Sequence, residues 1–287
     1  MNGNTLGAKH KGVQSVCDLC DMQNEGGGVM GWLHKFVLAS ASLGCLSISQ
    51  LHAEVRKQWV EYTHGPAALK AYMVDDDAAR GKKPAILMIH AREGMSETTQ
   101  RHAETWAKLG YVVFAADIFG FGHGVLPKTV PEMAAQTSLY TANRELSRAR
   151  VGAAYEAMKK QPQIDPDKIA ILGFCFGGDI STEFVAAGAP LLANITIHGS
   201  FRDREPGWAK DVKGQFLILH GAEDRGYPLP TVMKVIEELR SQKKEFLLEV
   251  YSGTEHGFSS PKNRDEERAM AQAIATSTRV LGELFSR

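Results

Sequence analysis

Residues 168–178 read KIAILGFCFGG, and this stretch decides the fold of the chain. Its first half, residues 169–172, is β-branched and aliphatic, which predicts a short buried strand. Its second half is a G-x-C-x-G sequence followed by small residues and an apolar run, which predicts a tight turn that enters a helix. Glycines flank such a turn because a β-carbon there would clash with neighbouring backbone. We therefore expect Cys175 to stand on a strained corner between a strand and a helix.

Cys175 has two competing interpretations at this corner. At the carboxyl end of a strand and the amino end of a helix, amide dipoles favour the thiolate, which is the nucleophilic form of the side chain. Glycine-rich turns also bind phosphate groups, and a cysteine within one can be a small buried apolar residue. The spacing differs from the G-x-G-x-x-G pattern of dinucleotide-binding proteins. The turn alone leaves a catalytic and a structural role open.

The composition of the chain bounds the classes of protein to which it can belong. Its 287 residues include 33 basic and 33 acidic side chains, for a formal net charge of zero, and 44% are hydrophobic. These values are ordinary for a globular protein with a sizeable core. No basic block stands out, so we expect neither nucleic acid nor an anionic membrane as a partner. We find no cofactor motif or metal-ligand cluster, and we expect neither a cofactor nor a metal site.

Residues 1–53 are predicted to be an N-terminal extension that precedes the folded domain. Within them, Lys35 supplies a positive charge, residues 36–49 form a mostly apolar run, and Ala53 ends the segment with a small residue. This order is typical of a secretory signal peptide, here at residues 30–53. The run is too short and too rich in serine to span a membrane. We therefore expect a periplasmic or secreted protein. The alternative is a disordered or amphipathic extension, with a cytoplasmic location.

The distribution of cysteines bears on this interpretation. Cleavage after Ala53 would leave Cys175 as the one remaining thiol, because the other three cysteines precede that point: Cys17, Cys20 and Cys45. A lone thiol in an oxidising compartment has no intramolecular disulfide partner, which favours a chemical role for it. The C-x-x-C pair in the extension has no second pair nearby that would complete a zinc site. Translation starts at either Met1 or Met30.

Residues 54–287 are predicted to form one domain in which strands alternate with helices. Ser96 is suited to begin a helix, Gly110 to follow its end, and residues 165–167 to turn the chain into the central strand. Strands are expected at residues 55–63, 69–74 (these two as a pair of edge strands), 85–90, 111–116, 169–172, 191–198, 215–220 and 245–251. Helices are expected from Ser96 to residue 109, at 131–160 with one break, after Cys175, at 231–242 and at 263–285. This alternation predicts an open, mostly parallel sheet with helices on both faces.

Two acid–base candidates follow later strands of the predicted sheet. Asp224 comes after the strand at residues 215–220, and His256 comes after the strand at residues 245–251. Because the active site of an open parallel sheet lies at the carboxyl ends of its strands, we expect both near Cys175. A thiol, an imidazole base and a carboxylate that orients the base are the minimum set for acyl transfer. The rival candidates are Glu223 for the acid and, for the base, three other histidines at strand ends: His90, His198 and His220.

From about residue 55 to residue 285 the chain resembles the dienelactone hydrolase family. The most specific motif is the G-x-C-x-G turn with cysteine where serine is usual, and the order Cys175, Asp224, His256 is that of the α/β-hydrolases. The other matching stretches are residues 89–90 with 94–95, 110–113, 117–120, 198–200, 220–224 and 256–258. The resemblance implies the α/β-hydrolase fold, with Cys175 as the nucleophile. It also implies that His256 is the general base and that Asp224 orients it.

The resemblance implies further features of the site. The main-chain N–H groups of Phe176 and Arg92 would form an oxyanion hole. The reaction would be hydrolysis of an ester or lactone of a small carboxylic acid through a cysteine thioester, as in a carboxymethylenebutenolidase. The alternatives are a broad carboxylesterase, or a non-catalytic thiol protein that binds a small molecule or senses oxidation. We expect a monomer or a homodimer.

Two positions depart from the pattern of the family. Its members usually carry a glutamate directly after the histidine of the first core strand, where it gates ionisation of the thiol. Here Ala91 follows His90, and Glu93, two positions later, is the candidate for this gating role. The enol-lactone hydrolases hold the substrate carboxylate with an arginine four residues past the catalytic histidine, and this chain has Ser260 there. The resemblance therefore implies membership of the family without implying activity on dienelactone itself.

Overall fold

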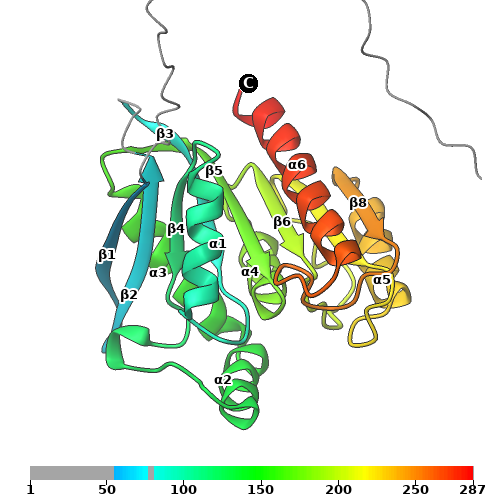
Figure 1. The fold of residues 1–287 in the computed structure, drawn as a ribbon, viewed down its shortest axis with the longest axis horizontal. Helices are drawn as coiled ribbons and strands as arrows, with labels where there is room; N and C mark the ends of the chain where they lie inside the picture. Colours follow the sequence, from blue (N-terminus) through cyan, green and yellow to red (C-terminus); the bar gives the residue numbers. More distant parts are fainter. Residues whose placement is uncertain (1–54, 77–80, 287) are drawn as a thin grey trace, which may run out of the picture. The chain divides into compact units, whose positions relative to one another are not determined.

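Strands and helices alternate along the chain in a computed structural model, which describes residues 55–76 and 81–286. Within these residues, eight strands form one sheet in the order β1-β2-β4-β3-β5-β6-β7-β8 (Figure 1). The strands are β1 (Val55–His64), β2 (Ala67–Asp76), β3 (Lys83–Ile89), β4 (Val112–Ala116), β5 (Ile164–Phe174), β6 (Ala193–Ile197), β7 (Gln215–Gly221) and β8 (Phe246–Tyr251). Strands β3 to β8 are parallel, as predicted. The predictions for residues 1–53, including the signal peptide and the three cysteines there, lie outside the described residues.

The first two strands differ from the predicted pair of edge strands. β1 pairs with β2 in an antiparallel register from Val55↔Asp76 to His64↔Ala67, and β1 is at the edge of the sheet. β2 is an inner strand, because it also pairs antiparallel with β4. Its burial agrees with that position, since Ala71 and Met73 are fully buried.

The turn predicted at residues 165–167 lies within strand β5. The pairing of β5 with β3 begins at Lys83↔Ile164, shifts register, and resumes at Ala85↔Ile169. The intervening residues of β5 are therefore an irregularity in the strand, of the kind that a β-bulge produces. The prediction of a separate turn was wrong because the chain keeps its extended direction through Pro166.

Four of the described helices begin at a side chain that accepts a hydrogen bond from a free main-chain N–H group. Ser96 caps α1, as predicted, and Asn263 caps the last helix. The predicted break within residues 131–160 falls at Asn143, whose side chain accepts from Leu146 N and so starts a new helix. The helical elements are α1 (Glu97–Ala107), the 3-10 helix η1 (Phe121–His123), α2 (Val130–Ala142), α3 (Arg144–Lys159), α4 (Phe176–Ala186), α5 (Leu229–Ser241) and α6 (Arg264–Phe285).

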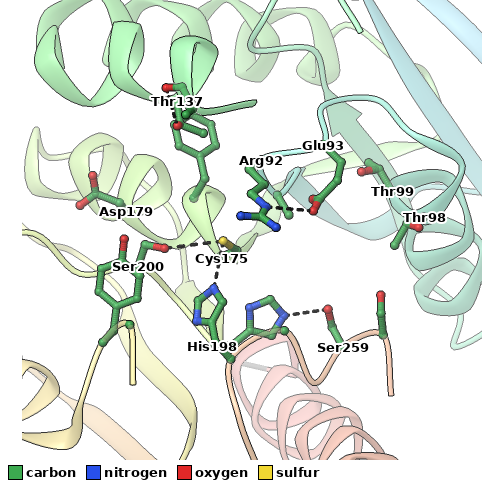
Figure 2. Close-up of a pocket in the computed structure, with 18 of the residues that line it drawn as sticks. Arg92, Glu93, Thr98, Thr99, Thr137, Cys175, Asp179, His198, Ser200 and Ser259 are labelled. Atoms are coloured by element: carbon green, nitrogen blue, oxygen red, sulfur yellow. Dashed lines mark hydrogen bonds and ion pairs between the residues drawn. The ribbon is translucent and has the colours of Figure 1, made fainter. Parts of the chain in front are cut away.

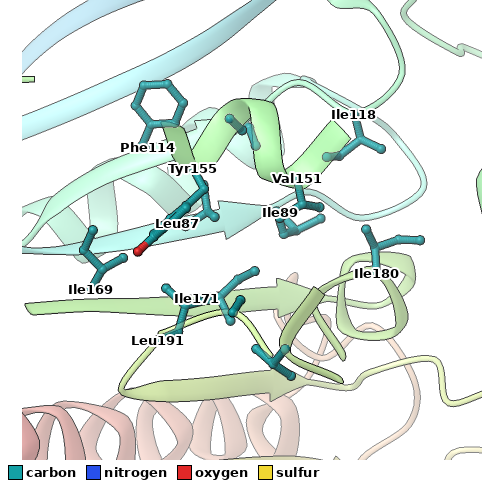
Figure 3. Close-up of a cluster of buried hydrophobic side chains, with 14 of the residues drawn as sticks. Leu87, Ile89, Phe114, Ile118, Val151, Tyr155, Ile169, Ile171, Ile180 and Leu191 are labelled. Carbon is teal, nitrogen blue, oxygen red and sulfur yellow. The ribbon is translucent and has the colours of Figure 1, made fainter. Parts of the chain in front are cut away.

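Helices cover both faces of the sheet, and each covered face has its own hydrophobic core. Residues alternate between the two faces along each inner strand, as the period of an extended chain requires. On β3, Leu87 and Ile89 belong to the core beneath α3, α4 and α5, which Figure 3 shows in part. Their neighbours Ile86 and Met88 belong to the core beneath α1 and α6. Burial on both faces explains why the sequence of these strands is continuously apolar.

Candidate active site

Cys175 occupies the turn between β5 and α4. Its backbone has φ 49° and ψ −118°, a left-handed conformation that side chains rarely adopt. The turn is possible because glycines surround it: a β-carbon on Gly173 would lie 2.2 Å from the carbonyl oxygen of Gly177. A β-carbon on Gly177 would lie 2.3 Å from the carbonyl oxygen of Ile89 on β3. The predicted strained corner is therefore present, and it holds the thiol above the end of the central strand.

Three side chains from three different strand ends form a continuous line in the site. Cys175 follows β5, Asp224 follows β7, and His256 follows β8. His256 Nε2 lies 3.1 Å from Cys175 Sγ, and His256 Nδ1 donates a hydrogen bond to Asp224 Oδ2 at 2.7 Å. Because these strands are parallel neighbours or near neighbours, their carboxyl ends meet at one edge of the sheet. The structure therefore brings together the three residues that the sequence analysis singled out.

Asp224 is held rigidly beneath the imidazole. The residue is 2% exposed, and its Oδ1 accepts main-chain N–H groups from Gly226 and Tyr227, both at 2.9 Å. Burial alone would raise the pKa of the carboxyl group, but its bonds to His256 and to the Tyr227 N–H lower the pKa. Glu223, its rival from the sequence, is exposed to solvent. Asp224 is thus the carboxylate that orients His256.

The thiol and the imidazole shift each other's pKa in opposite directions. Burial would raise the pKa of Cys175, but the hydrogen bond and the charge of His256, with Ser200 and the Phe176 N–H, bring it below its ordinary value. Burial would lower the pKa of His256, but the bonds to Asp224 and Cys175 raise it to about 9. Both shifts favour the thiolate–imidazolium form of the pair over its neutral form.

The three rival histidines are engaged elsewhere. All are buried, and burial lowers the pKa of each, so that they are neutral imidazoles. His90 donates through Nδ1 to the Ala91 carbonyl and accepts the Ile118 N–H at Nε2. His198 Nε2 shares a hydrogen bond with Ser259 Oγ, and His220 Nε2 donates to the Tyr227 carbonyl. His256 is thus the histidine in hydrogen-bond distance of the thiol within the described residues.

Of the two expected oxyanion donors, Phe176 lies against the thiol and Arg92 lines the cavity above it. The main-chain N–H of Phe176 faces Cys175 Sγ and contributes to lowering its pKa. This N–H is at the start of α4, where main-chain donors are free of helical partners. Arg92 lies in the segment that follows β3 and lines the same cavity as Cys175.

Glu93 lines the same wall of the cavity and contacts a different partner from the one expected of a gating residue. Its carboxylate pairs with Arg92 Nε at 3.4 Å (Figure 2). The side-chain hydrogen bonds of Cys175 go instead to His256 and Ser200. In this structure the thiol is therefore held by an imidazole and a hydroxyl.

A cavity of about 590 Å³ opens over Cys175. One wall comes from the segment after β3 and the start of α1, and another from the loop that carries His256. Helix α2 closes a third side with a stripe at helical spacing: Val130, Ala134, Thr137 and Thr141. The volume fits a small organic molecule rather than a long polymer.

Ser200 is a site residue that the sequence analysis assigned no role. Its Oγ lies 3.7 Å from Cys175 Sγ, and its main-chain N–H donates to the Cys175 carbonyl at 2.9 Å. The one signal was its place in the segment after strand β6, since polar side chains at strand ends gather at the site. A serine carries too little chemical information to be singled out on that ground.

A buried ion-pair network lies beside the cavity and was also missed. Arg204 is almost fully buried, and it pairs with Asp179 and with Glu183 on α4. Glu183 also pairs with Arg144 and Arg148 at the start of α3. Asp179 lines the cavity one helical turn past Cys175, so the network fixes the helix on which the thiol depends.

Two classes of feature are not found in the part of the chain that the structure describes. No group of three or more histidine, cysteine, aspartate or glutamate side chains there is arranged to hold a metal ion. None of its helices has the length and apolar character needed to cross a membrane.

Comparison with known proteins relates this geometry to a family. The model of the dienelactone hydrolase family matches residues 69–285. The carboxymethylenebutenolidase homolog of Rattus norvegicus is 26% identical over 225 residues, which cover 76% of this chain and 87% of the rat protein. The carboxymethylenebutenolidase homolog of Mus musculus is 25% identical over 225 residues, which again cover 76% of this chain and 87% of the mouse protein.

A solved structure agrees with these sequence relatives. A dienelactone hydrolase-like promiscuous phosphotriesterase from metagenomic libraries superposes with a TM-score of 0.74 and 26% identity. The superposition covers 80% of this chain and 98% of that protein. The eight-stranded sheet of the described residues, with its helices on both faces, is thus an α/β-hydrolase fold.

Proposed function

This chain belongs to the dienelactone hydrolase family and is a hydrolase, and we propose that it cleaves an ester or lactone of a small carboxylic acid through a cysteine thioester. The observation that carries the proposal is the continuous line from Cys175 Sγ through His256 to Asp224, with distances of 3.1 and 2.7 Å. This line ends at a cavity of about 590 Å³, where a small acyl substrate can reach the sulfur.

In the first half of the reaction the Cys175 thiolate attacks the acyl carbon. A carbon–sulfur bond forms, and the carbonyl electron pair moves onto the oxygen, which accepts hydrogen bonds from the N–H groups of Phe176 and Arg92. Such donors stabilise the oxyanion, and each typically raises the rate by about 10²–10³-fold. When the carbonyl re-forms, the bond to the alcohol oxygen breaks and that oxygen takes the proton from His256. The products are an acyl thioester and an alcohol, which remains attached when the substrate is a lactone.

In the second half a water molecule hydrolyses the thioester. Neutral His256 takes a proton from the water, whose oxygen attacks the acyl carbon. The carbon–sulfur bond then breaks, and the sulfur leaves as a thiolate while His256 keeps its proton. The acid is released and the starting ion pair is restored. Asp224 keeps Nδ1 protonated throughout, so that Nε2 faces the sulfur and the reacting oxygens.

The direct test uses the full chain with p-nitrophenyl acetate and a dienelactone, assayed side by side. We expect turnover of at least one substrate, and we expect the Cys175→Ala variant to lose it while its melting temperature stays within a few degrees. Turnover of the simple ester alone would identify a carboxylesterase of different acyl specificity. Retained activity in the variant, or acylation of Cys175 without turnover, would contradict the proposal and favour a non-catalytic thiol.

A further inference from the structure

Ser259 is held at two points by two histidines from different elements. It lies three residues past His256 in the same loop, and it lines the cavity. His102 on α1 bonds to the Ser259 carbonyl through Nε2 at 3.0 Å. His198, directly after β6, bonds to Ser259 Oγ through Nε2 at 2.7 Å. Each contact joins the loop to a separate buried element, so the position of Ser259 is fixed from both sides.

The direction of the first hydrogen bond follows from its acceptor. A carbonyl oxygen only accepts, so His102 Nε2 carries the proton. Burial lowers the pKa of His102, and its ring also stacks on Phe174 at 4.4 Å between centroids. His102 is therefore a neutral imidazole that anchors the main chain of the loop.

The direction of the second hydrogen bond follows from the other nitrogen of the His198 ring. His198 Nδ1 is buried, and no acceptor or donor among the described residues lies in hydrogen-bonding geometry to it. A neutral imidazole carries one proton, and burying an unpaired N–H is disfavoured relative to burying an unpaired lone pair. The proton therefore belongs on Nε2, and His198 donates it to Ser259 Oγ. Burial, together with the neighbouring charge of His256, keeps the pKa of His198 well below its ordinary value and holds the ring in this state.

This assignment leaves the hydroxyl proton of Ser259 to point away from His198. Within the described part of the chain, Ser259 Oγ has no second hydrogen-bond partner, and the residue borders the cavity (Figure 2). We propose that Ser259 is a substrate-binding residue whose hydroxyl proton is directed into the cavity by buried His198. The donor is aimed before the substrate arrives, so binding requires no further ordering of the hydroxyl.

The place of Ser259 relative to the proposed reaction indicates which part of a substrate it contacts. Ser259 is on the loop of His256, which protonates the leaving oxygen, whereas Arg92 lies on the other side of Cys175 (Figure 2). The inference rests on the proposed function, and it adds a substrate class: esters or lactones with a hydrogen-bond-accepting oxygen on the alcohol side of the scissile bond.

The test compares two acetate esters that differ by one atom. The meta-methoxyphenyl and meta-ethylphenyl esters have nearly the same size, with an ether oxygen in one where the other has a methylene group. We expect the full chain to prefer the methoxy ester in kcat/KM, and Ser259→Ala to lose this preference by about 2- to 10-fold, the worth of one neutral hydrogen bond. Ser252→Ala, an exposed serine outside the cavity, serves as the control and should keep the preference.

The outcomes separate the inference from the proposed function. If Ser259→Ala lowers kcat/KM equally for both esters, or leaves both values unchanged, the inference is overturned while the thioester reaction stands. Failure of the unmodified chain to hydrolyse either ester through Cys175 would contradict both.

His198 is tested as a positioning residue through its effect on Ser259. His198→Gln places an amide N–H near the position of Nε2 and should retain the preference for the methoxy ester, whereas His198→Leu should lose it. In the Ser259→Ala background, His198→Leu should not change the ratio of kcat/KM for the two esters any further, because the hydroxyl group that His198 directs is absent. Independent effects of the two substitutions on that ratio, or failure of glutamine to rescue it, would contradict the role of His198.

Discussion

The Cys175 thiol and the His256 imidazole lie within hydrogen-bond distance, and the Asp224 carboxylate favours the form in which the imidazole carries the proton. Burial alone would favour the neutral form of both groups. The Asp224 carboxylate, fixed by main-chain N–H groups, stabilises the imidazolium, and the imidazolium in turn stabilises the thiolate. Ser200 adds a hydroxyl at 3.7 Å from the sulfur. Three neighbouring side chains thus favour ionisation of Cys175.

The ion pair predicts a bell-shaped dependence of kcat/KM on pH. Burial raises the pKa of the thiol, but the hydrogen bond and charge of His256 bring it below its ordinary value, so activity should fall on the acid side as pH drops through that lowered value. On the alkaline side the imidazolium loses its proton near pH 9, and with it the acid that protonates the leaving group. Steady-state kinetics across this range check the profile. Activity that keeps rising with pH up to about pH 10, as expected for a thiol with an unperturbed pKa, would contradict the ion pair.

Asp224→Asn should remove most activity and shift the alkaline limb. The amide no longer stabilises the imidazolium, so the pKa of His256 should fall and the alkaline limb of kcat/KM should move to lower pH. The rate itself should fall by as much as about 10⁴-fold, because the imidazole is no longer held in the productive tautomer. The matched control is Glu223→Gln, the exposed neighbour, which should change neither quantity. Equal effects of the two substitutions would show that the assignment of the acid is wrong.

The turn from β5 to α4 shows how close backbone approach constrains one element. Gly177 packs against the main chain at the end of β3, and a β-carbon there would lie 2.3 Å from the Ile89 carbonyl oxygen. The three nearest atoms to that β-carbon are all main-chain atoms of Ile89 and His90, so movement of a flexible side chain cannot relieve the clash. The sequence signals this requirement through its glycines, since no other residue fits.

Two glycine-to-alanine substitutions should therefore change stability in opposite directions. Gly177→Ala should lower the free energy of unfolding by about 1–3 kcal/mol or more, because backbone must shift. Gly282→Ala, in the last turn of α6 with open space around it, should raise it by up to about 0.5–1 kcal/mol. Urea unfolding of the two variants and the parent chain measures both changes. A neutral effect of Gly177→Ala would mean that the turn is looser than described.

Elements with a local signal were predictable from the sequence, and those fixed by distant contacts were not. Ser96 and Asn263 marked helix starts because a capping side chain acts on N–H groups within three residues. The inner position of β2 depends on its pairing with β4, which begins almost forty residues further along the chain. The extended path through Pro166 depends likewise on the register with β3. Neither pairing leaves a pattern in the local sequence.

At the scale of the whole molecule, charged side chains from distant segments meet beside the active site. Arg204 lies between two carboxylates of α4, and its side chain is only 3% exposed. Burial raises the pKa of Asp179, and the charge of Arg204 opposes that effect. The sequence could not reveal this network, because an arginine in a polar loop resembles an ordinary surface residue until the chain folds around it. Cys175, Asp224 and His256 differ, since their order along the chain matches the α/β-hydrolase pattern and could be recognised in the sequence.

Arg204→Leu should lower the free energy of unfolding far more than a substitution that removes an exposed ion pair. Removal of the guanidinium breaks its buried pairs with Asp179 and Glu183, and breaking a buried pair typically costs about 3–5 kcal/mol. Glu183 keeps Arg144 and Arg148, so most of the cost should arise at Asp179, whose remaining ion-pair partner among the described residues is the exposed Arg202. Arg279→Leu removes an exposed pair with Glu283 on α6 and should cost at most about 1 kcal/mol. Thermal and urea unfolding of both variants provide the comparison. Similar losses in the two would indicate that the Arg204 network contributes no more than surface charge.

The measurement that tests the central claim most directly is the mass of the enzyme during turnover. The full chain is mixed with p-nitrophenyl acetate, quenched in acid within the first turnovers, and mapped by mass spectrometry. We predict an acetyl group on Cys175 that hydroxylamine removes, as a thioester requires, and no such adduct in Cys175→Ala. Turnover with the acetyl group on another residue, or undiminished turnover by Cys175→Ala, would contradict the thioester reaction.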